Sequence, residues 1–126
     1  MRCWSESGKV LTWHLEFAAD AEADFELIFD HLFESYVDFG EPPREAFEHA
    51  RNRIERIRAD ADRILKAPHR GQRHDDLLEG SRNLVIDRTS YWFMANDTAQ
   101  VVTVLAVFFG GQEERHRMLL RLIRGT

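Results

Sequence analysis

The spacing of apolar residues predicts one strand and two helices in the first half of this chain. Residues 10–17 alternate between apolar and polar side chains, as a half-buried strand does. Apolar residues at intervals of three and four then predict an amphipathic helix from about Ala19 to Asp38. A second amphipathic helix is expected to begin at Pro43 and to run to about Leu65, because proline is well tolerated in a first helical turn.

The second half of the chain predicts three strands and a further helix. Two short apolar segments, residues 82–87 and 90–95, precede a longer one at residues 100–109, and turn-forming residues separate them. Three consecutive strands joined by tight turns form an antiparallel meander. The longest segment is almost entirely apolar, so we expect it to be central in the sheet and covered on both faces. A helical stripe with interleaved arginines follows at residues 113–124.

These elements predict an α+β fold with the order strand, helix, helix, three-strand meander and C-terminal helix. We expect an antiparallel-rich four-stranded sheet with the helical hairpin packed on one face, and the first strand beside the last. The other face is then partly open, or covered by the C-terminal helix or by a partner. A length of 126 residues fits a single domain, with residues 1–9 as a loose N-terminal extension.

Composition and cysteine content limit the class of protein. The chain is 44% apolar and 31% charged, and no apolar run approaches the roughly 20 residues that span a bilayer. The first residues lack the apolar segment of a secretion signal. Cys3 is the only cysteine, so no intrachain disulfide can form. We therefore expect a cytoplasmic protein without membrane contact.

The net charge of −5 is unevenly distributed along the chain. Nine acidic residues follow one another from Glu16 to Glu41 with no lysine or arginine between them. A surface of this sign repels nucleic-acid phosphates. The run is either the solvated face of a helix or a docking face for a basic partner.

Few residue patterns in the chain point to chemistry. It has no nucleotide-binding loop, paired-cysteine zinc motif or nucleophile elbow. Arginines interrupt the histidines and aspartates of residues 69–76, so we expect an exposed polar loop there, with no metal and no cofactor. A metal-independent ribonuclease needs an acid–base group beside fixed cations. The candidates for these roles are Arg70, Arg73, His74, Arg82 and Tyr91.

Simpler roles for two of these candidates stay open. Arg82 is also explained as an ion-pair former at the edge of the sheet. Tyr91 and the two aromatic residues after it either pack in the core as strand residues or form a platform on which bases stack.

The order of several short motifs resembles the RelE/ParE superfamily of bacterial toxins. The resemblance covers about Leu11 to Phe109, from the opening strand to the final one. Each motif is weak alone, and their joint order and spacing carry the resemblance. In chain order the motifs are Ala21-x-x-Asp24-Phe25-x-x-Ile28, Pro43-x-x-Ala46, Leu65-x-x-Pro68-x-x-Gly71, Arg82-x-Leu84 and Tyr91 to Phe93.

This resemblance implies the growth-inhibiting toxin of a two-gene, type II toxin–antitoxin (plasmid stabilisation) module. Such a toxin is held inactive by a cognate antitoxin in a hetero-oligomer. RelE-like members are ribosome-dependent mRNA endoribonucleases, and ParE-like members are protein-binding poisons of DNA gyrase. The chain matches the RelE-like catalytic pattern only at Arg82, and Phe108-Phe109 stand where a polar catalytic group is expected. We therefore favour the ParE-like branch, without direct nucleic-acid contact; an endoribonuclease and a non-toxic interaction module are the alternatives.

The C-terminal helix is the expected contact region for the antitoxin, although simple packing on its own sheet also explains its apolar stripe. If an antitoxin binds there, its segment should be apolar with acidic flanks, to match the apolar and basic residues of the helix. The expected partner-binding residues are Arg82, Tyr91, Arg115, Arg117, Met118, Arg121 and Leu122.

Overall fold

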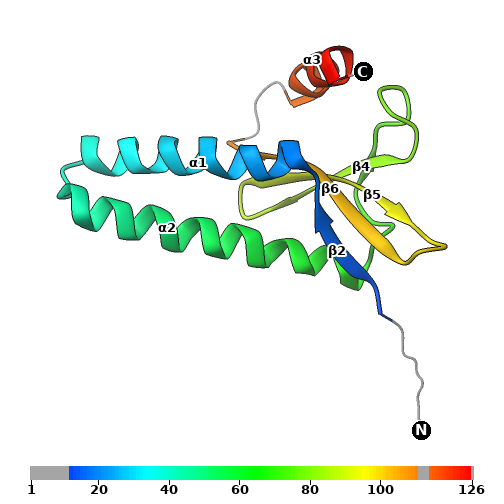
Figure 1. Ribbon diagram of the computed structural model, residues 1–126, viewed down its shortest axis with the longest axis horizontal. Coiled ribbons are helices and arrows are strands. Elements are labelled where there is room, and N and C mark those ends of the chain that lie inside the picture. Colours follow the sequence, from blue (N-terminus) through cyan, green and yellow to red (C-terminus); the bar gives the residue numbers. More distant parts are fainter. Residues whose placement is uncertain (1–11, 111–113, 126) are drawn as a thin grey trace, which may run out of the picture.

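Three α-helices and five strands make up the part of the chain that the structure describes, a computed structural model covering residues 12–110 and 114–125 (Figure 1). The elements are β2 (His14–Phe17), α1 (Ala19–Asp38), α2 (Pro43–Asp60), the 3-10 helix η1 (Ala61–Lys66), β3 (Gln72–Arg73), β4 (Ser81–Ile86), β5 (Thr89–Asn96), β6 (Val101–Phe109) and α3 (Glu114–Gly125). The predicted α+β class and the order of its main elements are confirmed.

The sheet has the strand order β2-β6-β5-β4-β3. The predicted neighbour of the first strand is correct, because β2 pairs with β6 in parallel, with His14 opposite Val101. The other three pairs are antiparallel, so the sheet is mixed. The predicted number of four strands is wrong by one. The additional strand, β3, consists of Gln72 and Arg73, and two polar residues are too short a segment to show a period.

Helices α1 and α2 form the expected hairpin, and they cover one face of the sheet. Figure 1 shows the two helices side by side and extending well beyond the strands. Apolar residues at helical spacing turn inward, and Phe25, Ile28 and Leu32 from α1 are almost fully buried. They meet Ile57 of α2 and the apolar residues of the sheet in the larger of two core clusters.

Strand β6 is central and covered on both faces, as its apolar sequence predicts. Val102, Val104 and Val107 are buried on the hairpin side. Ala106 and Phe108 belong to a second, smaller core on the opposite side, together with Trp92 and Met118. A register shift beside Trp92 and Phe93 lets β6 switch the faces of its residues, since a bulge adds one residue to a strand.

Several element boundaries differ from the expected ones. The second α-helix ends at Asp60, before the expected limit at about Leu65, and the chain continues as the 3-10 helix η1. Phe47 is 47% exposed, although its ring packs edge-on against Phe29 at a centroid distance of 5.2 Å. The expected extension at residues 1–9, the start of the first strand and position 113 lie outside the described residues.

Positive φ angles mark two points in the path of the chain, one directly after β4 and one directly before β3. Asp87 and Arg88 both have positive φ angles, 51° and 70°, which is typical of a tight two-residue β-hairpin. Gly71 has φ +109°, and a Cβ atom there would lie 2.6 Å from the carbonyl oxygen of Asn83. Glycine is therefore required where the polar loop meets β4. Among the helices of residues 12–110 and 114–125, none is long and apolar enough to cross a membrane.

Candidate functional site

Helix α3 packs on the face of the sheet opposite the hairpin and forms the centre of the candidate site. Met118 is 3% exposed and contacts the core of Trp92, Ala106 and Phe108. The outward side of the helix carries Leu119, Leu120 and Ile123, which are 42%, 51% and 67% exposed. Apolar residues therefore lie on both sides of α3, and only one side faces the sheet.

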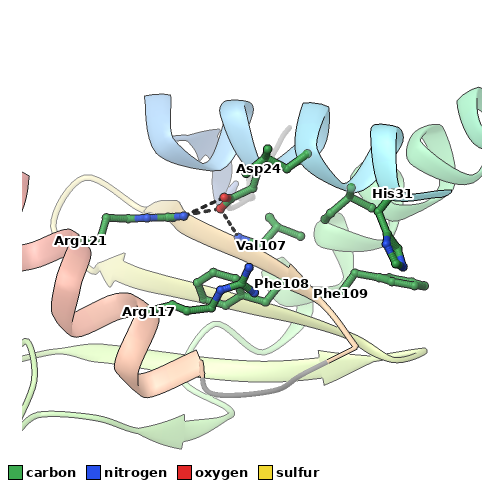
Figure 2. Close-up of a pocket in the computed structure, with 9 residues that line it drawn as sticks. Asp24, His31, Val107, Phe108, Phe109, Arg117 and Arg121 are labelled. Atoms are coloured by element: carbon green, nitrogen blue, oxygen red, sulfur yellow. Dashed lines mark hydrogen bonds and ion pairs between the residues drawn. The ribbon is translucent and has the colours of Figure 1, made fainter. Parts of the chain in front are cut away.

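A buried ion pair joins α3 to α1. Asp24 is 4% exposed, and both nitrogens of the Arg121 fork donate hydrogen bonds to its carboxylate, at 2.8 and 3.0 Å (Figure 2). The same carboxylate accepts the backbone N–H of Val107 at 2.9 Å, on the edge of β6 beyond the end of β2. The hydrogen bonds to Asp24 raise the pKa of the Arg121 guanidinium. Asp24 thus links α1, β6 and α3 at one point.

Figure 2 shows a recess beside this ion pair, between α1, the end of β6 and α3. Its volume is about 230 Å³. The guanidinium of Arg117 lies over the ring of Phe108, 5.1 Å from the centroid, and His31 lines the recess from α1. Arg121 is already paired with Asp24, so the aromatic floor with Arg117 at the rim is the part that suits an acidic or aromatic group of a protein partner.

A second recess on the other side of α3 is more apolar. Its volume is about 330 Å³, and Leu105 of β6 and Leu78 lie in its wall. Three of the predicted partner-binding residues, all on α3, contribute to this wall: Met118, Arg121 and Leu122. The structure therefore brings part of the predicted set together around one hollow. Because Met118 is almost fully buried, a partner would touch its edge and not its whole side chain.

A polar cluster at the start of α3 surrounds His74. The side chain of His74 stacks on Trp92, with ring centroids 4.2 Å apart, and its Nε2 lies 2.6 Å from Asn83 Oδ1. Its Nδ1 lies 2.6 Å from Nη1 of Arg115. A guanidinium can only donate, so Nδ1 accepts and the ring proton on Nε2 is donated to Asn83. The lone pair that a general base would need is therefore already used by Arg115.

Arg115 also binds Asp76, which fastens the start of α3 to the polar loop. The hydrogen bond from Arg115 lowers the pKa of the Asp76 carboxyl. A recess of about 420 Å³ opens at this cluster and is lined by Gln72, His74, Asn83, Trp92, Glu114, Arg115 and His116.

The predicted catalytic residues do not converge. Arg82 lies opposite Phe93 in the register of β4 and β5, and Phe93 belongs to the core on the hairpin side. His74 contacts Asn83 and Trp92, which lie on the α3 side. Successive residues of a strand point to opposite faces, so Arg82 and His74 are separated by the sheet.

Tyr91 is a clear correction to the sequence-based prediction. Its side chain is 0% exposed, and its hydroxyl donates a hydrogen bond of 2.6 Å to the backbone carbonyl of Ile57. Burial also raises the pKa of this hydroxyl far above its ordinary value. Tyr91 is therefore a core residue that joins β5 to α2, and it is available neither to a substrate nor to a partner.

The remaining residues of the polar loop also act separately. Arg73 pairs with Asp75 at 2.8 Å, and Arg70 is exposed. His69 binds Asp97 at 2.6 Å, away from the partners of His74. Within the described residues there is no group of three or more histidine, cysteine, aspartate or glutamate side chains placed to hold a metal ion.

Sequence reasoning missed the residues that hold α3 in place, above all Asp24 and Asn83. A signal for Asp24 was present, because it follows Ala21 by three residues and precedes Ile28 by four within the apolar stripe of α1. An acid in such a stripe is buried and must have a partner. Asn83 and Asp76 gave no comparable signal, since polar residues of loops and short strands are ordinarily exposed.

Solved structures show which proteins this chain is similar to. No protein-family model matches the sequence, and no curated protein matches it. A chain of the chromosomal ParDE toxin–antitoxin system from P. aeruginosa aligns with a TM-score of 0.58 and 19% identity, over 79% of this chain and 97% of that chain.

Two further solved structures are similar. A mutant of the E. coli toxin RelE in the free state aligns with a TM-score of 0.54 and 12% identity, over 90% of this chain and 99% of that chain. A chain of the toxin–antitoxin complex RelBE2 from Mycobacterium tuberculosis aligns with a TM-score of 0.51 and 16% identity, over 82% of this chain and 97% of that chain. At such identities the likeness concerns the fold. By its architecture, this chain has the fold of these ParDE, RelE and RelBE2 chains.

Proposed function

We propose that this protein is the toxin of a type II toxin–antitoxin module and is neutralised by a cognate antitoxin. The observation that carries this proposal is the fold, which it shares with chains of ParDE, RelBE2 and RelE over nearly the whole length of those chains. Hollows on both sides of α3 are consistent with a protein that works by binding another macromolecule.

Induced expression in a bacterial host tests the toxin role. Growth should stop after induction, and co-expression of the product of an adjacent small open reading frame should restore it. The variant Phe93→Asp places a charge in the buried core and serves as an unfolded control that should be harmless. Normal growth with the folded wild-type protein would instead support a non-toxic interaction module.

We propose further that the toxin acts by binding DNA gyrase. The candidate catalytic residues support a binding role because they do not form one site: Arg82 and His74 lie on opposite faces of the sheet, and Tyr91 is buried. The net charge of −5 also disfavours long contacts with RNA, because phosphate binding depends on clustered lysine and arginine. In arrested cells, we expect plasmids to lose negative supercoiling while transcripts stay intact.

An RNA-cleaving activity is the second candidate, and the recess at His74 is the observation that favours it. Arg115 and His116 line this recess beside His74, so two imidazoles and a guanidinium share one hollow. If RNA is cleaved there, Arg115→Ala should abolish cleavage of a ribosome-bound transcript, and Arg82→Ala tests the sequence-based assignment. Intact transcripts with the wild-type protein would exclude this candidate.

We propose that the antitoxin binds along α3, with an apolar segment in the recess of Leu105 and Leu122 and an acidic flank near Arg117. The variant Arg117→Glu should weaken the complex by about tenfold, since it reverses an exposed charge at the rim. Arg44→Glu is the matched control, because Arg44 is exposed on α2. Equal weakening by both variants would contradict this placement.

A further inference from the structure

A groove between α1 and α2, away from α3, combines an aromatic floor with a carboxylate rim. Its volume is about 400 Å³. Phe25, Phe29 and Ile54 supply its apolar lining, and Glu26 and Asp30 stand on its α1 side. The groove also includes Glu22 and Arg58, which are paired with each other.

Arg58 shows how this groove binds a cation. Its guanidinium lies over the ring of Phe25, 4.4 Å from the centroid, and also 5.0 Å from the centroid of Phe17. Both terminal nitrogens donate to the carboxylate of Glu22, at 2.6 and 3.2 Å. This arginine of α2 therefore stacks on an aromatic ring and donates hydrogen bonds to a carboxylate, which are two contacts that a guanidinium favours.

The same pair of residue types recurs along α1. Glu22 precedes Phe25 by three residues, and the pattern of an acid three residues before a phenylalanine repeats at Glu26 and Phe29. It repeats again at Asp30 and Phe33. The three pairs are spaced by four residues, about 6 Å along a helix, so they lie one above the other on one side of α1.

The second and third pairs differ from the first because α2 offers them no cation. Ile54 occupies the position on α2 one turn before Arg58 and lines the groove beside Phe29. Glu26 and Asp30 are exposed and have no cationic partner among the residues that the structure describes. The place at Glu26 and Phe29, which lines the groove and resembles the seat of Arg58, is thus left open to a partner. Asp30 also lines the groove, and Phe33 stacks on Phe29 one turn further along α1, with ring centroids 6.4 Å apart.

The negative charge of the hairpin attracts a basic partner to this groove over a long distance. Residues 26–49, which form the far part of the hairpin, contain seven carboxylates and one arginine. Their net charge is therefore −6, which exceeds the −5 of the whole chain, and the other residues sum to +1. This part of the hairpin projects beyond the sheet in Figure 1, so a partner can approach it without contacting α3.

We propose that this groove docks a basic protein segment, with one arginine over Phe29 between Glu26 and Asp30 and a second cation one turn further along α1. Arginine suits the site better than lysine, because a planar guanidinium stacks on an aromatic ring while it donates to carboxylates. The acidic surface selects against nucleic acid as the occupant. This surface is separate from the hollows around α3.

The proposal is tested with the full-length, 15N-labelled protein and an alanine-based helical peptide that carries two arginines four residues apart. We expect chemical-shift changes confined to residues 22–33 and 54–58, and weaker binding by a matched peptide with lysines. The double variant Glu26→Gln/Asp30→Asn should weaken peptide binding by about tenfold. Both substitutions are on exposed positions, so the thermal midpoint of unfolding should remain the same as in the wild type.

A control variant separates the groove from general attraction to an acidic arm. Asp38→Asn/Glu45→Gln removes the same charge from exposed positions of the hairpin outside the groove. We expect it to change the affinity by less than about twofold. Equal weakening by the two double variants, shifts spread over the whole hairpin, or no binding of the arginine peptide at low salt would each overturn the proposal.

Discussion

At the scale of single residues, Asp24 explains how α3 is held against the rest of the protein. It occupies a position in the apolar stripe of α1, where an unpaired carboxylate would be costly. Two hydrogen bonds from Arg121 and one from the backbone of Val107 make this burial possible. Such a pair contributes little compared with well-packed apolar residues, but removing one partner leaves a buried charge.

Substitution of Arg121 tests this explanation. We expect Arg121→Met to lower the free energy of unfolding by about 2–4 kcal/mol, because Asp24 then stays buried without its cation. Arg124→Met is the control on the same helix, since Arg124 is exposed and should change stability by less than about 0.5 kcal/mol. Urea denaturation measures both values. Equal stability of the two variants would show that the ion pair is not needed.

Gly71 lies close to the backbone of β4, directly before the short strand β3. We expect Gly71→Ala to lower the free energy of unfolding by about 2 kcal/mol, because a Cβ atom would meet the carbonyl oxygen of Asn83 and the φ angle is positive. Gly40 has a similar φ of +105°, but an added Cβ atom there would meet nothing within 4 Å, so Gly40→Ala reports the backbone strain alone. A smaller effect at Gly71 than at Gly40 would contradict the contact.

At the scale of elements, α3 is a separately attached unit. It is attached by Met118 in the small core, by the buried ion pair of Arg121 with Asp24, and by an exposed ion pair of Arg115 with Asp76. We expect Met118→Ala to increase amide hydrogen exchange in α3 by at least about tenfold while β6 keeps its protection. Hydrogen-exchange mass spectrometry measures both segments. A parallel loss of protection in α1 and β6 would show that α3 unfolds only with the whole domain.

The pair of Glu22 and Arg58 links α1 to α2 and should depend on pH. The hydrogen bond from Arg58 lowers the pKa of the Glu22 carboxyl in the folded protein. A lowered folded-state pKa means that this stabilisation is present above the unfolded-state value, near 4.5, and is lost as the pH falls through the folded-state value.

We therefore expect Glu22→Gln to lower the free energy of unfolding by about 0.5 kcal/mol at neutral pH, a small value because the pair is largely exposed. The difference from the wild type should shrink as the pH falls below about 4. Denaturation curves at several pH values measure this trend. Glu26→Gln is the control, and a pH-dependent loss of the same size for both variants would contradict a specific role for the pair.

The strongly periodic elements were predictable from the sequence, and the short or polar ones were not. The apolar stripe of α1 and the apolar run of β6 predicted the type of each element and nearly its first and last residues. Burial produces such a pattern because it requires apolar side chains at regular positions over many residues. The two-residue strand β3 and the 3-10 helix after Asp60 depend on tertiary contacts and left no such pattern.

The candidate site was less predictable, because it depends on which face of the sheet each side chain meets. Arg82 and His74 are close in the chain, yet strand parity places them on opposite faces. Tyr91 belongs to a strand with three consecutive aromatic residues, and the sequence alone does not say that all three are buried. The proximity of Met118, Arg121 and Leu122 was easier to predict, since residues at intervals of three and four lie on one side of a helix.

At the scale of the whole molecule, the fold presents two separate surfaces of opposite character. Arginines and apolar residues surround α3 on one side of the sheet, and carboxylates and aromatic rings line the projecting hairpin on the other. A protein with this division can contact two partners at the same time. This arrangement is consistent with a toxin that is controlled by one protein and acts on another.

The supercoiling activity of purified DNA gyrase, measured with increasing amounts of the purified protein, tests the central proposal most directly. We expect supercoiling of a relaxed plasmid to stop at near-stoichiometric amounts, and we expect the cognate antitoxin to restore it. Unchanged supercoiling in the presence of a folded protein that still arrests growth would contradict the proposal that gyrase is the target.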